Sequence, residues 1–397
     1  MSTSRITYQR IKGESPAFLG WLGALGLLIV LGLASAWTME HHGHVITGMS
    51  NRIVWGLPHV FAVFMIVAAS GALNVASIAS VFGKSAYKPL APLSTLLALA
   101  LLVGGLSVLV LDLGRPDRLI VAMTTYNFSS IFAWNIYLYV GFIAVGVVYL
   151  WMMMERRMNA YTKPVGVFAF IWRLALTTGT GSIFGFLVAR QAWDAAIMAP
   201  MFIALSLAFG LAVFLVLTIA ISRQTGRELG AGLLRRLGRL LGIFAAVVLY
   251  FAAIQHLTNL YAAEHAEVER FILFDGGIYT ALFWLGQIVI GGVIPLALIF
   301  APQIKSSANT VMWAALAVII GGFAQLYVII IGGQAFPQIL FPGRIVESSF
   351  ADGGIAAYAP SLPELGLGLG GAALALAIVT LVIKILAVLP TTMADKD

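Results

Sequence analysis

The stretch LSTLLALALLVGGLSVLVLDLGRPDR, residues 93–118, begins as an unbroken apolar run and ends in a cluster of charged residues. The apolar run, Leu93–Leu111, is long enough to cross a bilayer core of about 30 Å as a helix. Gly114 and Pro116 can end this helix, because Gly tolerates left-handed backbone and Pro cannot continue the hydrogen-bond ladder. The stretch therefore predicts a membrane-spanning helix that stops in a charged turn.

An acidic residue stands directly at the end of the apolar run. A charged side chain at the centre of a bilayer costs about 2.5–3.5 kcal/mol on insertion scales, and less near an interface. Asp112 and Arg115 are three residues apart, so we expect them to pair on one helix face. Two interpretations remain open at this point: a charged helix stop, or a functional site at the membrane boundary.

The composition places the whole chain in a membrane. Hydrophobic residues make up 61% of the 397 residues and charged residues 10%, whereas a soluble domain carries about 25% charged residues. Mean hydropathy is +0.99. We therefore expect an all-α polytopic membrane protein. The absence of Cys excludes disulfides, Cys-ligated iron–sulfur clusters and thiolate zinc sites within this chain.

Ten apolar segments are long enough to span the membrane. They are approximately Phe18–Trp37, Trp55–Ser80, Leu93–Leu113, Ile131–Met154, Val165–Ala189, Met201–Ser222, Leu241–Ala263, Tyr279–Ala301, Val311–Gly333 and Gly366–Leu389. Ala34-Ser35-Ala36 resembles a signal-peptidase site, but we expect the first segment to remain attached as a span. An even number of spans puts both termini on one side.

The loops on the side of the termini hold most of the Lys and Arg residues, so we expect both termini in the cytoplasm. This asymmetry accounts for the net charge of +7, and no nucleic-acid partner is expected. The predicted location is the bacterial inner (cytoplasmic) membrane, in contact with its lipid. The longest outer connection runs from Gln334 to Leu365.

Polar side chains inside a membrane are candidates for function, because lipid offers them no partners. His59 lies about one turn into the second span, in Trp55-Gly56-Leu57-Pro58-His59. By the predicted topology, His59 and Asp112 enter from the same outer side at similar depth. An imidazole and a carboxylate are suited to take protons from a quinol head group, since His changes charge near neutrality. The alternative is that His59 only hydrogen-bonds a neighbouring helix.

Two further groups of residues are candidates. Trp134 and Tyr137 lie high in the fourth span after Tyr126, and they belong either to an interfacial aromatic belt or to the wall of a ring-shaped ligand. A second polar group in the seventh span holds Gln255, His256 and Asn259, followed by Glu264. A second quinone site, a proton route and structural hydrogen bonding are all open for this group.

No metal or haem is expected in this chain. Bis-histidine haem ligation needs two histidines at matched depth, and only His59 and His256 lie within spans. The Glu40–His44 cluster could hold a metal, but a solvated loop is the preferred interpretation. Arg173 lies inside the fifth span, and the sequence identifies no partner for it.

Several motifs together resemble the NrfD/PsrC family of quinone-interacting membrane subunits. They are Leu-Asp-Leu-Gly-Arg-Pro at 111–116, Trp55–His59, Phe132-Ala133-Trp134 and Gly291-Gly292-Val293-Ile294-Pro295-Leu296. Within the family, ten spans and a His-rich loop after the first span are most similar to the DsrP type, from a sulfite-reduction-associated complex. The membrane subunit of hydrogenase-2 is the near alternative.

The resemblance implies two four-helix bundles with an added helix at each end. The implied divisions are 1–54 (first helix and His-rich loop), 55–190 (first bundle), 191–333 (second bundle) and 334–397 (outer loop and last helix). It also implies a menaquinone or ubiquinone pocket in the first bundle near the outer face. The implied partners are a periplasmic ferredoxin-like iron–sulfur subunit and other membrane and cytochrome subunits.

Residue by residue, the resemblance makes His59 the quinone-contacting histidine and carries over Asp112 and Arg115 from the signature. The Asn that the family places three residues before this histidine is replaced by Gly56. The family's quinone-contacting Tyr corresponds to either Tyr126 or Tyr137. Trp55 and nearby aromatic residues are expected to pack against the quinone ring, with Arg115 orienting Asp112.

The sequence therefore predicts a quinone-reactive subunit that has no catalytic activity alone and exchanges electrons with an iron–sulfur partner, in sulfur- or sulfite-linked metabolism. A secondary transporter is the rival class, for which Pro295 and the Gly321-Gly322 pair would supply helix breaks. A membrane anchor whose polar clusters only pack is the third alternative.

Overall fold

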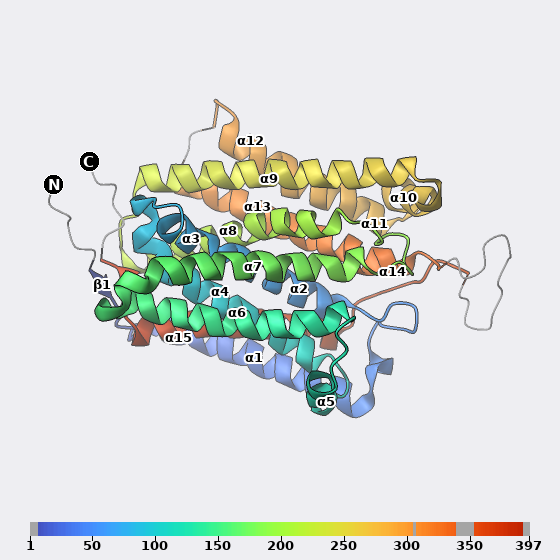
Figure 1. Ribbon diagram of the computed structural model, residues 1–397, viewed down its shortest axis with the longest axis horizontal. Helices are drawn as coiled ribbons and strands as arrows, with labels where there is room; N and C mark the ends of the chain where they lie inside the picture. The colour runs from blue at the N-terminus through green and yellow to red at the C-terminus, as the bar shows by residue number, and fades with distance from the viewer. Residues whose placement is uncertain (1–6, 305–306, 339–352, 392–397) are drawn as a thin grey trace.

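A computed structural model describes residues 7–304, 307–338 and 353–391 of the chain. The long helices run side by side along the long axis of the molecule (Figure 1). Ten helices in these described ranges are long and apolar enough to cross a membrane. The prediction of an all-α polytopic membrane protein is confirmed. Residues 339–352 of the predicted long connection lie outside the described residues.

The membrane-crossing helices match the ten predicted apolar segments, and several are built from consecutive pieces. They are α1 (Pro16–His42), α2 (Leu57–Ala72) with α3 (Asn74–Ser80), α4 (Ala91–Leu111), α6 (Ile131–Met154), α7 (Thr162–Gly185), α8 (Met198–Thr225), α9 (Ala231–Tyr261), α11 (Ile278–Ala281) with η7 (Leu282–Val293) and α12 (Ile294–Phe300), α13 (Ala308–Tyr327) with η8 (Val328–Gly332) and α14 (Gly333–Ala335), and α15 (Leu362–Ile385). The segments η7 and η8 are π-helical.

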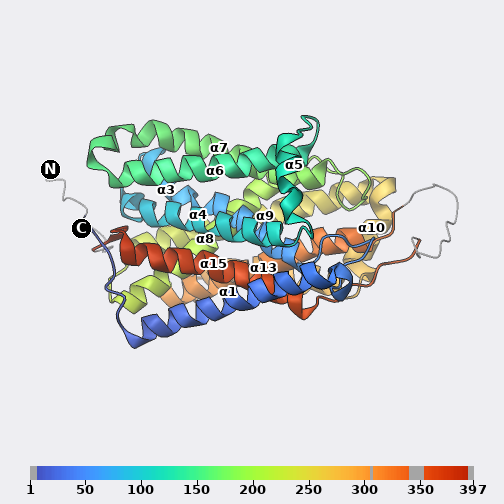
Figure 2. The ribbon, with the colours of Figure 1, turned by 90° about the horizontal axis from the view of Figure 1, so that it is seen from below.

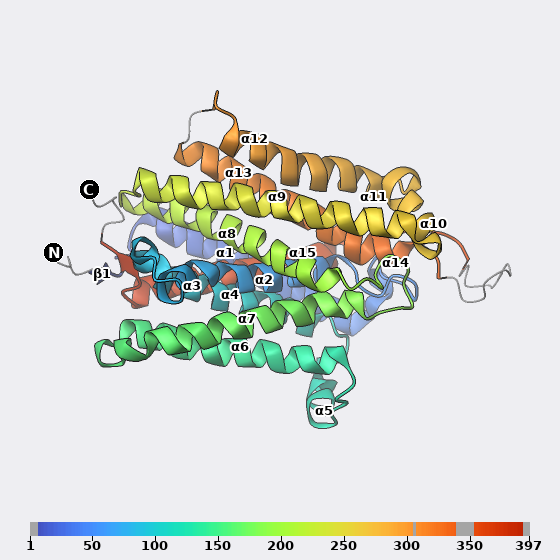
Figure 3. The ribbon, with the colours of Figure 1, turned by 45° about the horizontal axis from the view of Figure 1, so that its top comes forward.

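Short elements connect these helices. They are η1 (His44–Ile46), η2 (Ser85–Leu90), η3 (Pro116–Arg118), α5 (Leu119–Thr124), η4 (Arg156–Tyr161), η5 (Ala263–His265), α10 (Ala266–Arg270) and the π-helical η6 (Phe271–Asp275). Figure 3 shows α5 standing out from the bundle beside α6.

Two short strands mark one end of the helix bundle. The strand β1 (Tyr8–Gln9) pairs antiparallel with β2 (Leu389–Pro390). We call this the terminal end, and we call the opposite end, where α10 and α14 lie (Figure 1), the distal end. The pairing agrees with the even number of spans. That the terminal end faces the cytoplasm stays a prediction.

Close helix contacts depend on glycine at two crossings. The helices α1 and α15 lie side by side (Figure 2), and Gly32 meets Gly370 where they cross. The central helix α2 crosses α8 at Gly71, which lies directly against the backbone of Ser206. No Cβ would fit at these positions, and such close backbone approach is typical of helix packing in membranes. The buried core is continuous through both halves of the chain, and the division into two bundles stays a prediction.

The break between α2 and α3 is contacted by the buried Arg173 of α7. The Ser94 hydroxyl accepts from the Ala76 amide and donates to the Ala72 carbonyl, which satisfies backbone groups at the break. The Arg173 guanidinium donates to Asn74 Oδ1 at 2.8 Å and lies over the Phe170 ring. Asn74 is therefore the partner that the sequence could not identify.

Candidate functional site

His59 is held at the distal start of α2. Pro58 stands in the first turn, where its missing amide hydrogen is no loss, and the His59 amide donates to the Gly56 carbonyl. A Cβ at Gly56 would collide with Glu364 and Tyr358. Packing against these two side chains therefore accounts for Gly at position 56, where the resemblance implies Asn.

Asp112 is the first residue after the α4 span. Its amide donates to the Val108 carbonyl, so it closes the last turn of the helix. Its side chain is only 1% exposed, and the Oδ2 atom lies 2.9 Å from His59 Nδ1. The two atoms are at ion-pair distance without aligned hydrogen-bond geometry. The structure brings together the two residues that the sequence placed at similar depth.

A third residue, His44, completes the group. Its Nε2 atom lies 3.1 Å from the Asp112 carbonyl oxygen and 3.6 Å from Oδ1. The next turn passes close to the His44 ring because Gly114 adopts a φ of 69° and carries no side chain. The sequence analysis placed His44 only in a solvated cluster. The sequence of a loop does not indicate which helix end its side chains contact.

The charges in this group support one another. Burial by itself would raise the pKa of Asp112, but its interactions with His44 and His59 outweigh burial and hold that pKa below the ordinary value. The contact with the Asp112 carboxylate raises the pKa of His44. A carboxylate flanked by two imidazoles is a group that can hold and pass on a proton. Both imidazoles reach the surface, with side chains 15% (His59) and 32% (His44) exposed.

The expected pairing of Arg115 with Asp112 is wrong. Arg115 instead makes a bidentate, exposed pair with Asp117, with both nitrogen–oxygen distances 3.0 Å. The chain leaves the helix after Asp112, so the three-residue spacing no longer puts the side chains on one face. Two histidines take the place predicted for Arg115, and a role for Arg115 at the site stays a prediction.

Trp55 stands beside His59, and its expected contact with a quinone ring stays a prediction. The Trp55 and His59 rings stack with their centroids 5.8 Å apart. The other sides of the indole meet Phe132, Phe184 and Trp193 at centroid distances between 5.3 and 6.0 Å. Sequence reasoning missed Phe184 and Trp193 as parts of this aromatic wall.

The segment that carries Trp55 is fixed by Gln334, which lies on α14 far along the chain. The Gln334 side-chain oxygen accepts from the amides of Val54 and Trp55, at 2.9 and 3.0 Å. Its side-chain nitrogen donates to the Trp55 and Ile330 carbonyls. Arg190 adds bonds to the carbonyls of Gln334 and Arg52. One buried amide thus sets the backbone from which the indole projects.

The C-terminal helix supplies a second anchor. The Tyr358 hydroxyl accepts from the Leu57 amide at 2.6 Å and donates to Glu364 Oε1 at 2.7 Å. Burial, together with the Glu364 contact, raises the pKa of Tyr358, so it remains a neutral phenol. The fully buried Glu364 also accepts from the Gly48 amide. The start of α2 is therefore tied to α15.

The residues Tyr126, Trp134 and Tyr137 form a separate aromatic cluster. The Tyr126 ring packs edge-on against Tyr137 at 4.8 Å, and the Trp134 indole donates to the Phe128 carbonyl. The cluster is largely exposed, and none of the described contacts joins it to His59 or Asp112. It fits an interfacial belt, and its predicted contact with a quinone stays a prediction.

The second polar group contains a different acid from the expected one. The carboxylate of Glu269 is fully buried and lies 2.6 Å from His256 Nδ1, and it accepts from Asn259 at 2.8 Å. Glu264 is exposed and pairs with His265 instead. Gln255 is buried, with its amide 4.0 Å from the Met198 sulfur. The sequence analysis missed Glu269 because the spacing of 13 residues from His256 does not show that α10 folds back onto α9.

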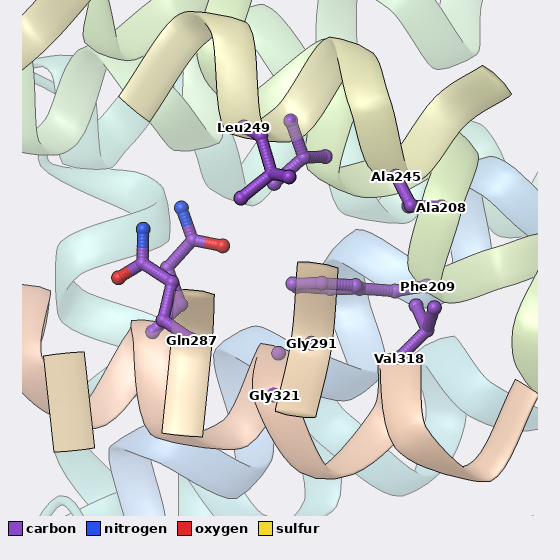
Figure 4. Close-up of a pocket in the computed structure, with 11 residues that line it drawn as sticks. Ala208, Phe209, Ala245, Leu249, Gln287, Gly291, Val318 and Gly321 are labelled. Carbon is purple, nitrogen blue, oxygen red and sulfur yellow. The ribbon is translucent and has the colours of Figure 1, made fainter. Parts of the chain in front are cut away.

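A small cavity lies in the second half of the chain, away from His59. It is bounded by α8, α9, η7 and α13, and Figure 4 shows Leu249, Phe209 and Gln287 around it. Its volume of about 10 Å³ holds about one water molecule. It is far too small for a ring-shaped ligand.

The described residues contain no group of three or more His, Cys, Asp or Glu arranged to hold a metal ion. In the Glu40–His44 cluster, His41 stacks on Trp37 at 5.1 Å and meets His42 edge-on. Among the histidines of this cluster, His44 is the one that contacts Asp112.

Comparison with known proteins gives consistent results. Residues 45–338 match the family model described as polysulphide reductase, NrfD. The chain is 27% identical over 394 residues, 98% of both proteins, to the Hdr-like menaquinol oxidoreductase integral membrane subunit of Archaeoglobus fulgidus. It is 30% identical to a Halobacterium salinarum protein assigned as a dimethyl sulfoxide reductase membrane subunit, over 88% of this chain and 87% of the other. It is 24% identical to one of the polysulfide reductase polypeptides of Wolinella succinogenes, over 72% of this chain and 96% of the other. The chain belongs to the NrfD family of polysulphide-reductase-type membrane subunits.

Proposed function

We propose that this protein is the quinone- and quinol-binding membrane subunit of a respiratory oxidoreductase complex. The observation that carries the proposal is the group formed by His59, Asp112 and His44 at the distal end. A buried carboxylate with two surface-reaching imidazoles fits the exchange of protons with a head group at the membrane boundary. The names of the relatives, which include a menaquinol oxidoreductase subunit, support the same ligand class.

In the oxidising direction, a quinol becomes a quinone by releasing two protons and two electrons. One quinol hydroxyl would donate to His59 Nε2, for which the described residues provide no partner. His59 Nδ1 faces Asp112, so the carboxylate stabilises the imidazolium that forms. The Trp55 indole beside His59 offers a face for the quinone ring. Asp112 and His44 would then pass this proton toward the surface, and the second proton would leave from the other hydroxyl to water at the membrane boundary.

The electrons need an acceptor outside this chain. Because the sequence has no Cys, we assign them to a ferredoxin-like iron–sulfur subunit docked at the distal end, on the periplasmic face. Other membrane and cytochrome subunits would complete the complex, in the bacterial inner membrane with both termini in the cytoplasm. Menaquinone or ubiquinone would be the carrier, and a DsrP-type role in sulfur or sulfite metabolism is our specific proposal.

The test compares quinol-dependent electron flow in complexes carrying His59→Ala or Asp112→Ala with the wild type. We expect both variants to assemble with the iron–sulfur subunit and to lose quinol-linked turnover. Normal turnover in both variants would remove the proposed site. Solute uptake by vesicles holding the lone subunit would favour a transporter instead, and assembly without quinone binding would favour an anchor.

A further inference from the structure

A second histidine–carboxylate pair lies at the distal end of the other half of the chain. His256 is in α9, five residues before the helix ends at Tyr261, which is about 7 Å along the helix axis. Its Nδ1 atom lies 2.6 Å from Glu269 Oε2. The Glu269 side chain is 1% exposed, and its other oxygen accepts from Asn259. The carboxylate is thus fully paired and inaccessible.

The imidazole of this pair has one free position. Nδ1 is engaged by Glu269, no hydrogen bond joins Nε2 to another described residue, and the side chain is 14% exposed. In a neutral imidazole, the carboxylate acceptor at Nδ1 requires the ring proton on that nitrogen, which leaves Nε2 as the accepting nitrogen. The outer nitrogen is therefore set to accept from a hydroxyl on an approaching ligand.

Two aromatic side chains lie on the same side of the molecule as His256, one against its ring and one against that neighbour. The Phe283 ring meets His256 edge-on at 4.6 Å, and Phe283 meets Trp284 at 4.9 Å. The Trp284 indole is fixed by donating to the Leu273 carbonyl, and about half of its surface is exposed. Phe283 and Trp284 lie on the π-helical η7, and Leu273 lies on the π-helical η6. Such π-helical segments are rare and are frequently found at functional sites.

The chemistry of the pair selects the ligand class. A phosphate head group is disfavoured, because the group behind the imidazole is a carboxyl and the neighbouring Arg270 is engaged by Asp275 at 2.8 Å. A neutral ring bearing a hydroxyl would satisfy Nε2 and stack on the exposed indole. The same elements occur at His59: Nδ1 on a buried carboxylate, Nε2 without a described partner, and an indole or phenyl ring alongside.

We propose that His256, Glu269 and the Phe283–Trp284 wall form a second binding site for a quinol head group, in the other half of the molecule from His59. The choice of a quinol as the ligand rests on the function proposed for the His59 site. The existence of a second binding site is an additional proposal. No electron transfer is assigned to the second site. It would bind quinol from the lipid phase at the same distal end.

The experiment uses the assembled complex and a photoreactive azido-naphthoquinol, with labelled peptides mapped by mass spectrometry. We expect two labelled regions, one around His59 and one around His256 or Trp284. An excess of unmodified naphthoquinol should abolish both labels. In His256→Asn, the amide nitrogen can still reach Glu269 while Nε2 is lost, so labelling of the second region should fall about tenfold.

Trp284→Leu provides a variant that leaves the buried pair intact, and it should lower the same label. Glu264→Gln, which changes the exposed acid of this segment, is the matched control and should change neither label. His59→Ala should remove only the first label. Labelling at the first region alone would overturn the second site and leave the first intact. Second-region labelling that survives both His256→Asn and Trp284→Leu would also overturn it, as nonspecific reaction from lipid.

Discussion

His44 contacts Asp112 twice, through the backbone carbonyl at 3.1 Å and the carboxylate oxygen Oδ1 at 3.6 Å. The loop after α1 is thereby attached to the end of α4 at the point where His59 approaches the other carboxylate oxygen. The two histidines share one buried anion. Changes at His44 should therefore affect both the stability of the distal end and the protonation of Asp112.

The His44 contact predicts a pH-dependent stability. Because the pKa of His44 is raised above 6.5, its contribution is complete below pH 6.5 and is lost as pH rises through the raised value. The lowered pKa of Asp112 makes its contribution complete above about pH 4 and lost on further acidification. His44→Gln should thus lower the thermal midpoint more at pH 5.5 than at pH 8.5. The difference between the two pH values should correspond to about 0.5–1 kcal/mol in the free energy of unfolding.

The control for His44 is His42→Gln, which lies in the same cluster without a described contact to Asp112. It should show no such pH-dependent difference. An equal effect of His44→Gln at both pH values would mean that packing, and not charge, holds the loop to α4.

Arg115 should be dispensable for proton handling, despite its place in the signature. Its guanidinium is exposed and engaged by Asp117, and exposed pairs contribute little to stability. Arg115→Ala should leave quinol-linked turnover within about twofold of wild type, in a steady-state assay of the assembled complex. A loss as large as that of Asp112→Ala would show that Arg115 contacts the ligand or the partner.

Gln334 should control the position of the Trp55 ring. Replacing it with Ala removes the acceptor of the Val54 and Trp55 amides, and each lost hydrogen bond costs about 0.5–1.5 kcal/mol. We expect a lower thermal midpoint and a raised KM for quinol with a smaller change in kcat, because the ring wall is displaced while His59 and Asp112 remain. Gln303→Ala, at an exposed loop position, is the matched control.

If Gln334→Ala lowers kcat while KM stays constant, the indole does not help to bind the ring. If both constants are unchanged in a destabilised protein, Gln334 has a purely structural role. Either result would show that anchoring of the backbone by Gln334 is independent of quinol binding at the Trp55 ring.

Hydropathy was sufficient to predict the ten spans, because each needs only a long apolar run. It also brought His59 and Asp112 together, since both stand at span ends on one side of the membrane. The predicted Arg115 contact was wrong because the helix ends at Leu111 with Asp112 as its cap, and the left-handed backbone of Gly114 then turns the chain away. Local sequence rules apply only while the helix continues.

The remaining parts of the site come from distant segments. Gln334 and Tyr358 act on residues 54–57 from positions about 280 to 300 residues away, and the sequence carries no periodic signal for such contacts. Glu269 was missed for a related reason: a short turn and α10 fold it back onto α9. These contacts require the tertiary packing itself.

The most direct test of the central claim is single-turnover reduction of the iron–sulfur partner by a naphthoquinol in the assembled complex, with Asp112→Asn compared with the exposed control Asp117→Asn. We expect Asp112→Asn to slow cluster reduction at least about a hundredfold, the usual scale for a lost proton acceptor, while Asp117→Asn matches the wild type. Equal rates in Asp112→Asn and the wild type would show that Asp112 does not take the quinol proton.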